Sequence, residues 1–88
     1  MKAIDVVISG RVQAVGFRAF TRKTAVMPGV RGYVENLSDG RVHAVFEGDD
    51  LQVEKLLELV RHGPRMSQVR DVRAMDVEQA GYKLFDIR

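Results

Sequence analysis

The segment V-R-G-Y-V-E-N-L-S-D-G-R-V-H-A-V-F-E, residues 30–47, decides how this chain folds. Two β-favouring runs, residues 30–37 and 41–47, flank the sequence S-D-G, which is typical of a hairpin turn. The second run alternates and places Val42, Ala44 and Phe46 on one face. The segment therefore predicts two antiparallel strands that direct one face toward a core.

Before the hairpin, the sequence predicts a strand and a helix. Residues 4–9 form a β-rich apolar run. From residue 17 onward the apolar spacing changes to that of a helix, and Pro28-Gly29 is a strong signal for its end. One side of this helix is expected to consist of Phe17, Phe20, Thr21, Thr24 and Met27.

After the hairpin, the sequence predicts a second helix and two further strands. Asp49 or Asp50 is expected to cap the helix, and Gln52, three residues after Asp49, completes the pattern of a capping box. Residues 68–77 and 83–87 are the predicted strands. The apolar face of the helix has the spacing i, i+3, i+4, i+7 and consists of Val53, Leu56, Leu57 and Val60.

The predicted order of elements is β-α-β-β-α-β, followed by a short extra C-terminal strand. Each helix has one apolar face to cover, and the hairpin makes neighbouring strands antiparallel. The simplest arrangement is an α+β, ferredoxin-like two-layer sandwich, with two helices on one face of an antiparallel sheet. Because this fold hosts many unrelated functions, function has to be argued from a site.

Composition limits the classes of protein to consider. The chain has 88 residues, 45% of them hydrophobic and 30% charged, so we expect residues 1–88 to form one free-standing domain. There is no cysteine, which excludes disulfides and thiolate chemistry, and a net charge of +2 gives no reason to expect nucleic-acid binding. No apolar run approaches the roughly 20 residues that span a bilayer, and the N-terminus lacks a signal-peptide cleavage pattern. We therefore expect a cytoplasmic protein.

Residues 10–18, G-R-V-Q-A-V-G-F-R, join the first predicted strand to the first turn of the first helix. The first N–H groups of a helix have no internal partner, and the helix dipole is positive there. Gly10 and Gly16 allow the loop to curl so that further N–H groups converge on an anion. Arg18, in the first turn, could bind two phosphate oxygens at once. The segment is therefore a candidate phosphate site, although ordinary loop glycines and a solvated arginine explain the same residues.

Three polar side chains outside this loop are further candidates for a functional role. Asn36 lies two residues before the predicted turn, where asparagine commonly bonds the local backbone. His43 and His62 are the only histidines, and neither has partners at metal-ligand spacing. No metal site is predicted, and no G-K-[ST] sequence follows the loop, so it implies neither a nucleotide nor Mg²⁺.

Two segments resemble the signatures of the acylphosphatases, small enzymes that hydrolyse the carboxyl–phosphate bond of acyl phosphates. They are G-R-V-Q-A-V-G-F-R-A-F, residues 10–20, and G-Y-V-E-N-L-S-D-G-R-V, residues 32–42. Gly63-Pro64 and the terminal F-D-I-R are also similar to the family, so the resemblance covers essentially the whole chain. It implies a ferredoxin-like fold and a hydrolase that needs neither metal nor cofactor.

The resemblance also implies roles for individual residues. The family's phosphate-binding arginine falls on Arg18, and the asparagine that positions the attacking water falls on Asn36. The implied reaction is direct attack of water on the phosphorus, which releases a carboxylate and inorganic phosphate. A carboxylate leaving group needs no protonation, so binding the phosphoryl oxygens and holding a water in line are the main requirements. The loop residues implied to form the backbone cradle are Arg11, Val12, Gln13, Ala14, Val15 and Gly16.

Ala14 departs from the family pattern, which usually has glycine at this position. If the position needs a positive φ, alanine costs about 1–2 kcal/mol, whereas a need for a small side chain alone makes alanine nearly neutral. The departure leaves one alternative function, a non-catalytic ferredoxin-like module that binds phosphate or another anion. The expected partners are a small acyl phosphate and inorganic phosphate or another anion in the loop. We expect no nucleic-acid or membrane partner, and a monomer.

Overall fold

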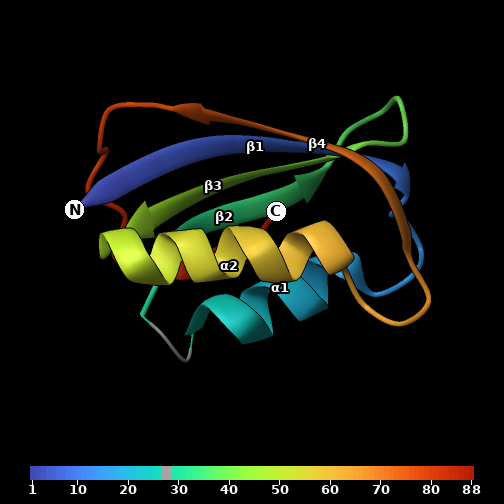
Figure 1. The fold of residues 1–88 in the computed structure, drawn as a ribbon, viewed down its shortest axis with the longest axis horizontal. Helices are drawn as coiled ribbons and strands as arrows, with labels where there is room; N and C mark the ends of the chain where they lie inside the picture. Colours follow the sequence, from blue (N-terminus) through green and yellow to red (C-terminus); the bar gives the residue numbers. More distant parts are fainter. Residues whose placement is uncertain (27–28) are drawn as a thin grey trace.

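A computed structural model describes residues 1–26 and 29–88. It confirms the predicted order of elements, a β-α-β-β-α-β arrangement with a short strand after it (Figure 1). The predictions made for Met27 and Pro28 lie outside the described residues. The elements are β1 (Lys2–Arg11), α1 (Phe17–Val26), β2 (Arg31–Asn36), β3 (Val42–Gly48), α2 (Asp50–His62), β4 (Gln68–Asp76) and β5 (Phe85–Ile87).

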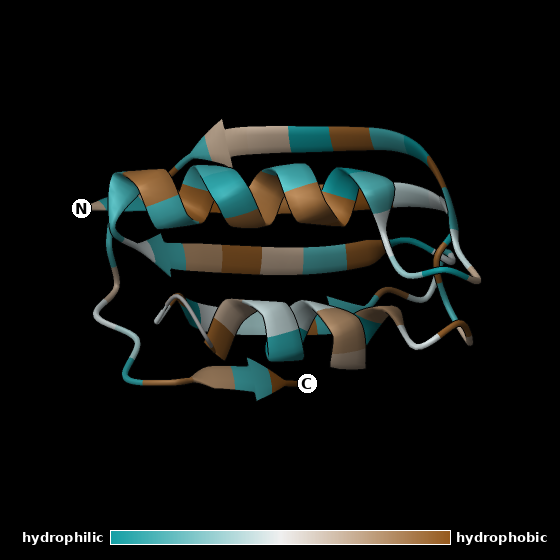
Figure 2. Ribbon diagram, turned by 60° about the horizontal axis from the view of Figure 1, so that its bottom comes forward, coloured by the Kyte–Doolittle hydropathy of each residue, from teal (hydrophilic) through white to brown (hydrophobic). Residues whose placement is uncertain are grey.

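The five strands form one sheet in the order β4-β1-β3-β2-β5. The pairs β1–β3, β1–β4 and β2–β3 are antiparallel, as predicted. The short strand β5 pairs with β2 in the parallel direction, so the sheet is mixed and not antiparallel throughout. The reason is the connection formed by residues 77–84, which carries the chain from β4 at one edge to β5 at the opposite edge, where β5 runs beside β2 (Figure 2).

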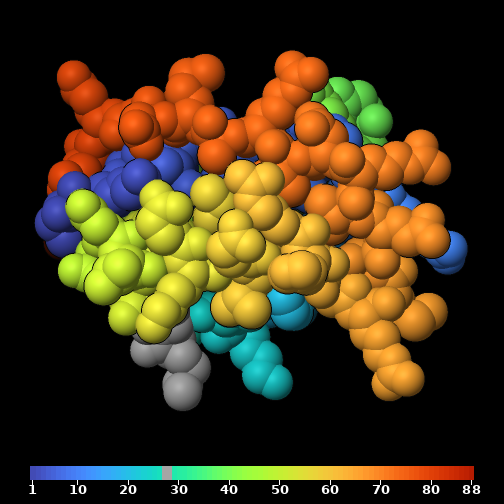
Figure 3. All heavy atoms as spheres, viewed as in Figure 1, coloured from blue at the N-terminus to red at the C-terminus, as the bar shows by residue number. Residues whose placement is uncertain are grey.

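Both helices cover the same face of this sheet and enclose the core. The four predicted apolar residues of α2 are buried, and hydrophobic residues recur along this helix with hydrophilic ones between them (Figure 2). Side chains of α2 occupy the middle of the helical face, between the β4 side and α1 (Figure 3). Full burial of a side chain such as Val53 or Leu56 contributes about 1.5–3 kcal/mol. The facing strand residues include Val6, Ile8, Val34, Val42, Ala44 and Phe46.

The predicted face of α1 is confirmed for the residues that the structure describes, and it also includes Ala25, which was not predicted. The buried residues of this helix are Phe17, Thr21 and Ala25, whereas Phe20 and Thr24 are only half-buried. The helix therefore presents an i, i+4, i+8 row to the sheet. Thr21 can occupy this apolar environment because its hydroxyl donates to the main-chain oxygen of Phe17 at 2.8 Å.

The predicted capping box at the start of α2 is wrong. Asp49 is the N-cap residue, and its main-chain oxygen accepts the N–H of Val53 at 2.9 Å. Its carboxylate makes no capping hydrogen bond. Because Asp49 is exposed, water can solvate this carboxylate without help from the first turn.

A buried carboxylate fixes the connection that leads to β5. Glu47 in β3 alternates with Phe46, so its side chain lies on the sheet face opposite the helices, where it is 1% exposed. Its two oxygens accept the backbone N–H groups of Ala80 at 2.6 Å, Gly81 at 3.0 Å and Tyr82 at 3.0 Å. Charge-assisted hydrogen bonds of this kind are strong, so Glu47 holds the segment that delivers β5 to β2.

Candidate active site

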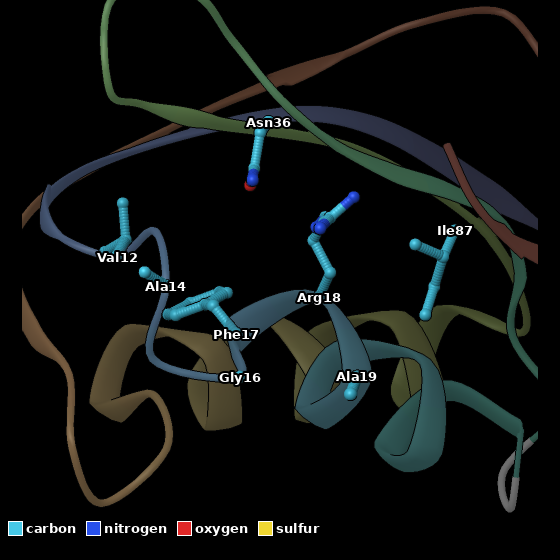
Figure 4. Close-up of a pocket in the computed structure, with 8 residues that line it drawn as sticks. All are labelled: Val12, Ala14, Gly16, Phe17, Arg18, Ala19, Asn36 and Ile87. Carbon is cyan, nitrogen blue, oxygen red and sulfur yellow. The ribbon is translucent and has the colours of Figure 1, made fainter.

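A hollow of about 190 Å³ lies where the loop after β1, the first turn of α1, the end of β2 and β5 meet. Arg18 and Asn36, which come from two separate motifs, both line it. Their side chains extend into the same space from α1 and β2, with the loop on one side and Ile87 on the other (Figure 4). The complete lining is Val12, Ala14, Gly16, Phe17, Arg18, Ala19, Asn36 and Ile87.

The loop begins at an irregularity in β1. The pairing of β1 with β4 shifts register between Ser9 and Gly10, and Gly10 has φ +125°. A Cβ at Gly10 would clash with the main-chain oxygen of Gln68, so only glycine allows this close approach. The bulge turns the chain out of the sheet and into the loop.

The loop ends at the N-terminus of α1 with unpaired backbone donors. Gly16 has φ +78°, and its main-chain oxygen accepts the N–H of Phe20 at 2.9 Å, the first bond of the helix. Within the part of the chain that the structure describes, no backbone N–H of residues 13–16 donates to another protein group. Free donors beside the positive end of a helix dipole create a suitable environment for a phosphate.

Ala14 has φ +60°, so its backbone is left-handed. Of the two explanations considered for this position, a positive φ is the one that the structure supports. Alanine in this conformation costs about 1–2 kcal/mol relative to a residue without a Cβ. The loop nevertheless adopts the curled shape, and Ala14 lies at the edge of the hollow.

Arg18 is half-buried in the first turn of α1, and the residue that follows β5 orients it. Its Nη1 donates to the main-chain oxygen of Arg88 at 3.1 Å, while the N–H of Arg88 donates to the main-chain oxygen of Val34 at 2.8 Å. A guanidinium has five N–H donors, so this contact leaves others for an anion in the hollow.

Asn36 is the last residue of β2, and its side chain is exposed to the hollow. The alternative role for Asn36 was a hydrogen bond from its side chain to the turn backbone, but other hydrogen bonds close the turn. Leu37 donates its N–H to the main-chain oxygen of Arg41 at 2.8 Å, and Gly40 donates to that of Leu37 at 3.2 Å. The side-chain hydrogen bond from Arg41 holds the pKa of the Asp39 carboxyl below its usual value. The turn is therefore stabilised without the Asn36 amide.

The role of the Gln13 side chain could not be predicted from the sequence. Its Nε2 donates to the main-chain oxygens of Leu37 at 2.7 Å and Arg41 at 2.9 Å. Ala19 and Ile87, which line the hollow, were not predicted either. No local pattern could have revealed these residues, because their positions depend on contacts between segments far apart in the sequence.

The two histidines lie outside the hollow. Nδ1 of His43 is 2.7 Å from a Glu35 oxygen, and its Nε2 is 2.9 Å from an Asp5 oxygen. Burial lowers the pKa of His43, but the hydrogen bonds and charges of Asp5 and Glu35 outweigh burial and raise it above its ordinary value. His62 is exposed in the last turn of α2. Over residues 1–26 and 29–88, no group of three or more His, Cys, Asp or Glu side chains is arranged so that it could hold a metal ion. None of the helices in these ranges has the length and apolar character of a membrane span.

Comparison with known proteins shows which family the chain belongs to. The family model described as Acylphosphatase matches residues 4–87. The chain belongs to the acylphosphatase family. A curated acylphosphatase from Methanocella arvoryzae is 62% identical over 88 residues, which is 100% of both chains. As an acylphosphatase, the protein is a hydrolase of the carboxyl–phosphate bond of acyl phosphates, and these findings favour an enzyme over a non-catalytic anion-binding module.

Solved structures show the same fold. The crystal structure of acylphosphatase from Bacillus subtilis superposes with a TM-score of 0.97 at 32% identity, covering 100% of this chain and 99% of that one. Full-length HypF, crystallised in a phosphate- and nucleotide-bound form, contains a similar region. There the TM-score is 0.92 at 31% identity, and the match covers 99% of this chain but only 12% of HypF. The acylphosphatase fold thus occurs both alone and within a much longer chain.

Proposed function

We propose that Arg18 and the backbone N–H groups of residues 11–16 bind the phosphoryl group of an acyl phosphate, and that the Asn36 amide orients the attacking water. The observation that carries this proposal is the convergence of three kinds of group on one hollow: unpaired loop donors, a guanidinium and an amide. The first two suit phosphoryl oxygens because both are donors with positive charge or partial charge. The amide is neutral and can hold a water through its oxygen.

In the proposed reaction, the water oxygen bonds to phosphorus as the bond from phosphorus to the acyl oxygen breaks. The bonding electrons leave with that oxygen as a carboxylate, and both protons of the water remain on the phosphate as dihydrogen phosphate. No protein base is required to balance this step. Catalysis then depends on neutralising the phosphoryl oxygens and on alignment, which are the main contributions in phosphoryl transfer.

We further propose that the reaction needs no metal or cofactor, since a carboxylate leaves readily without an electrophile and the guanidinium and loop donors balance the phosphoryl charge. The near-balanced charge of +2 supports a small-molecule partner in place of nucleic acid or a membrane surface. Residues 1–88 are proposed to act as one monomeric domain in the cytoplasm, which size-exclusion chromatography and cell fractionation would test.

The test is hydrolysis of benzoyl phosphate, followed by ultraviolet absorbance in excess chelator. Arg18→Ala and Asn36→Ala are each expected to lower kcat by about 10²–10³, the usual cost of losing one preorganised group. Arg61→Ala and Gln79→Ala, on exposed side chains outside the hollow, serve as matched controls that should retain activity. Circular dichroism verifies that each variant is folded. Activity within about threefold of the parent in a folded Arg18→Ala or Asn36→Ala protein would contradict the assigned role.

A further inference from the structure

We infer that the Gln13 side chain is a positioning residue, which aligns the water held by Asn36 with the phosphoryl group held by the loop. This inference rests on the proposed function and gives Gln13 a task beyond the backbone cradle. It starts from the two hydrogen bonds that join Gln13 to the turn after β2, at 2.7 Å and 2.9 Å.

The proposed phosphate-binding groups and the proposed water-binding group belong to different parts of the chain. Residues 11–16 and Arg18 form one continuous segment at the start of α1. Asn36 is the last residue of β2, and the next residue, Leu37, lies 24 positions after Gln13 in the sequence. Attack in line requires the water oxygen, the phosphorus and the leaving oxygen to be collinear, so the relative placement of these two parts sets the reaction geometry.

Gln13 connects the phosphate-binding loop to the turn that follows Asn36, so it links the two parts directly beside the proposed water-binding group. Leu37 directly follows Asn36, and Arg41 faces Leu37 across the base of the turn. A single amide NH₂ supplies two N–H donors, and here each is directed to one of the two main-chain oxygens. These two hydrogen bonds hold both ends of the turn between β2 and β3 against the loop, immediately beside Asn36.

The chemistry of the contact requires donors at this position. Both acceptors are backbone carbonyls, so a side chain without N–H groups cannot replace Gln13 even when its volume is similar. Losing these two hydrogen bonds leaves residues 11–18 intact as a unit, because β1 and α1 anchor its two ends. Phosphate binding should therefore survive, while the alignment of Asn36 is lost.

The experiment compares Gln13→Leu with the parent protein in steady-state hydrolysis of benzoyl phosphate. We expect kcat to fall by between about tenfold and 100-fold, the cost of misplacing reacting groups by about 1 Å. KM and the inhibition constant for inorganic phosphate should stay within about twofold, because uniform binding of the phosphoryl group is retained. Gln79→Leu, the same substitution on an exposed side chain, is the control and should alter none of these values.

A check of folding and a second variant keep the test decisive. Thermal unfolding verifies that Gln13→Leu is folded, and Gln13→Met, an unbranched chain without donors, replaces it if it is not. A kcat close to that of the parent, or a loss of phosphate binding as large as the loss in kcat, overturns the inference.

Arg18→Ala and Asn36→Ala are measured in the same series so that the proposed role of Gln13 and the proposed roles of Arg18 and Asn36 can be tested separately. If both remain active, the proposed roles of the hollow fail. If both are inactive while Gln13→Leu keeps its kcat, only the role of Gln13 fails.

Discussion

Replacing Ala14 with glycine is expected to make the protein more stable. Ala14 has φ +60°, and relief of the left-handed strain favours the variant by about 1–2 kcal/mol. Glycine also gives the unfolded chain more freedom, which opposes this by about 0.4–1 kcal/mol. Because the Ala14 methyl group is exposed, its removal costs little burial. The free energy of unfolding should rise by about 0.5–1 kcal/mol, the difference between these two contributions.

The assay is thermal unfolding followed by circular dichroism, with urea unfolding to obtain the free energy. The expected increase in Tm is about 2–8 °C, given about 4–8 °C per kcal/mol in a domain of this size. Ala80→Gly is the matched control, since Ala80 is exposed in a connection, lacks a positive φ and keeps its N–H to Glu47 in the variant. It should lower the stability by about 0.4–1 kcal/mol. The reasoning is refuted if Ala14→Gly lowers Tm as Ala80→Gly does.

Two further predictions concern the sheet face opposite the helices. The pKa of His43 is raised in the folded protein, so the stability that it contributes is fully present below about pH 6.5, its value when unfolded, and is lost as the pH rises through the folded value. Tm measured from pH 5 to pH 9 should therefore fall more steeply in the parent than in His43→Gln, and equal slopes would disprove the coupling. Glu47→Gln places an NH₂ group against backbone donors and should lower the free energy of unfolding by about 1–3 kcal/mol, as measured with urea. The exposed Glu78→Gln is its control, and a similarly small change in both would show that the carboxylate is not needed.

Local patterns predicted the parts of the fold that one element determines by itself. The apolar spacing of α2 is regular and its four apolar residues are buried, because this helix packs on β4, β1 and β3 along its length. The face of α1 was predicted less completely, since the most deeply buried row of this helix also includes Ala25. The parallel direction of β5 could not be predicted, because a buried carboxylate far away in sequence fixes the connection before it.

The candidate site likewise has a part that local sequence predicts and a part that depends on tertiary contacts. The residues of the loop and Arg18 follow from backbone requirements that a short motif records, namely glycines for the curl and a helix N-terminus for the free donors. The contacts of Gln13 and of Arg88 depend on tertiary placement and leave no local trace in the sequence. The conformation of Ala14 also needed the structure, because alanine is compatible with both explanations until φ is known.

Asn36 shows how the core and the site depend on the same register. Val34 is fully buried beneath the helices, and side chains two residues apart in a strand share a face, so Asn36 lies on the helical side of the sheet. At the end of β2 this is the side on which α1 begins, and there the amide reaches the hollow. A slip of one residue would replace Asn36 with the carboxylate of Glu35 and would also expose Val34. A carboxylate would repel a phosphoryl group, so the pairing that buries the core also gives the hollow an amide that a phosphate tolerates.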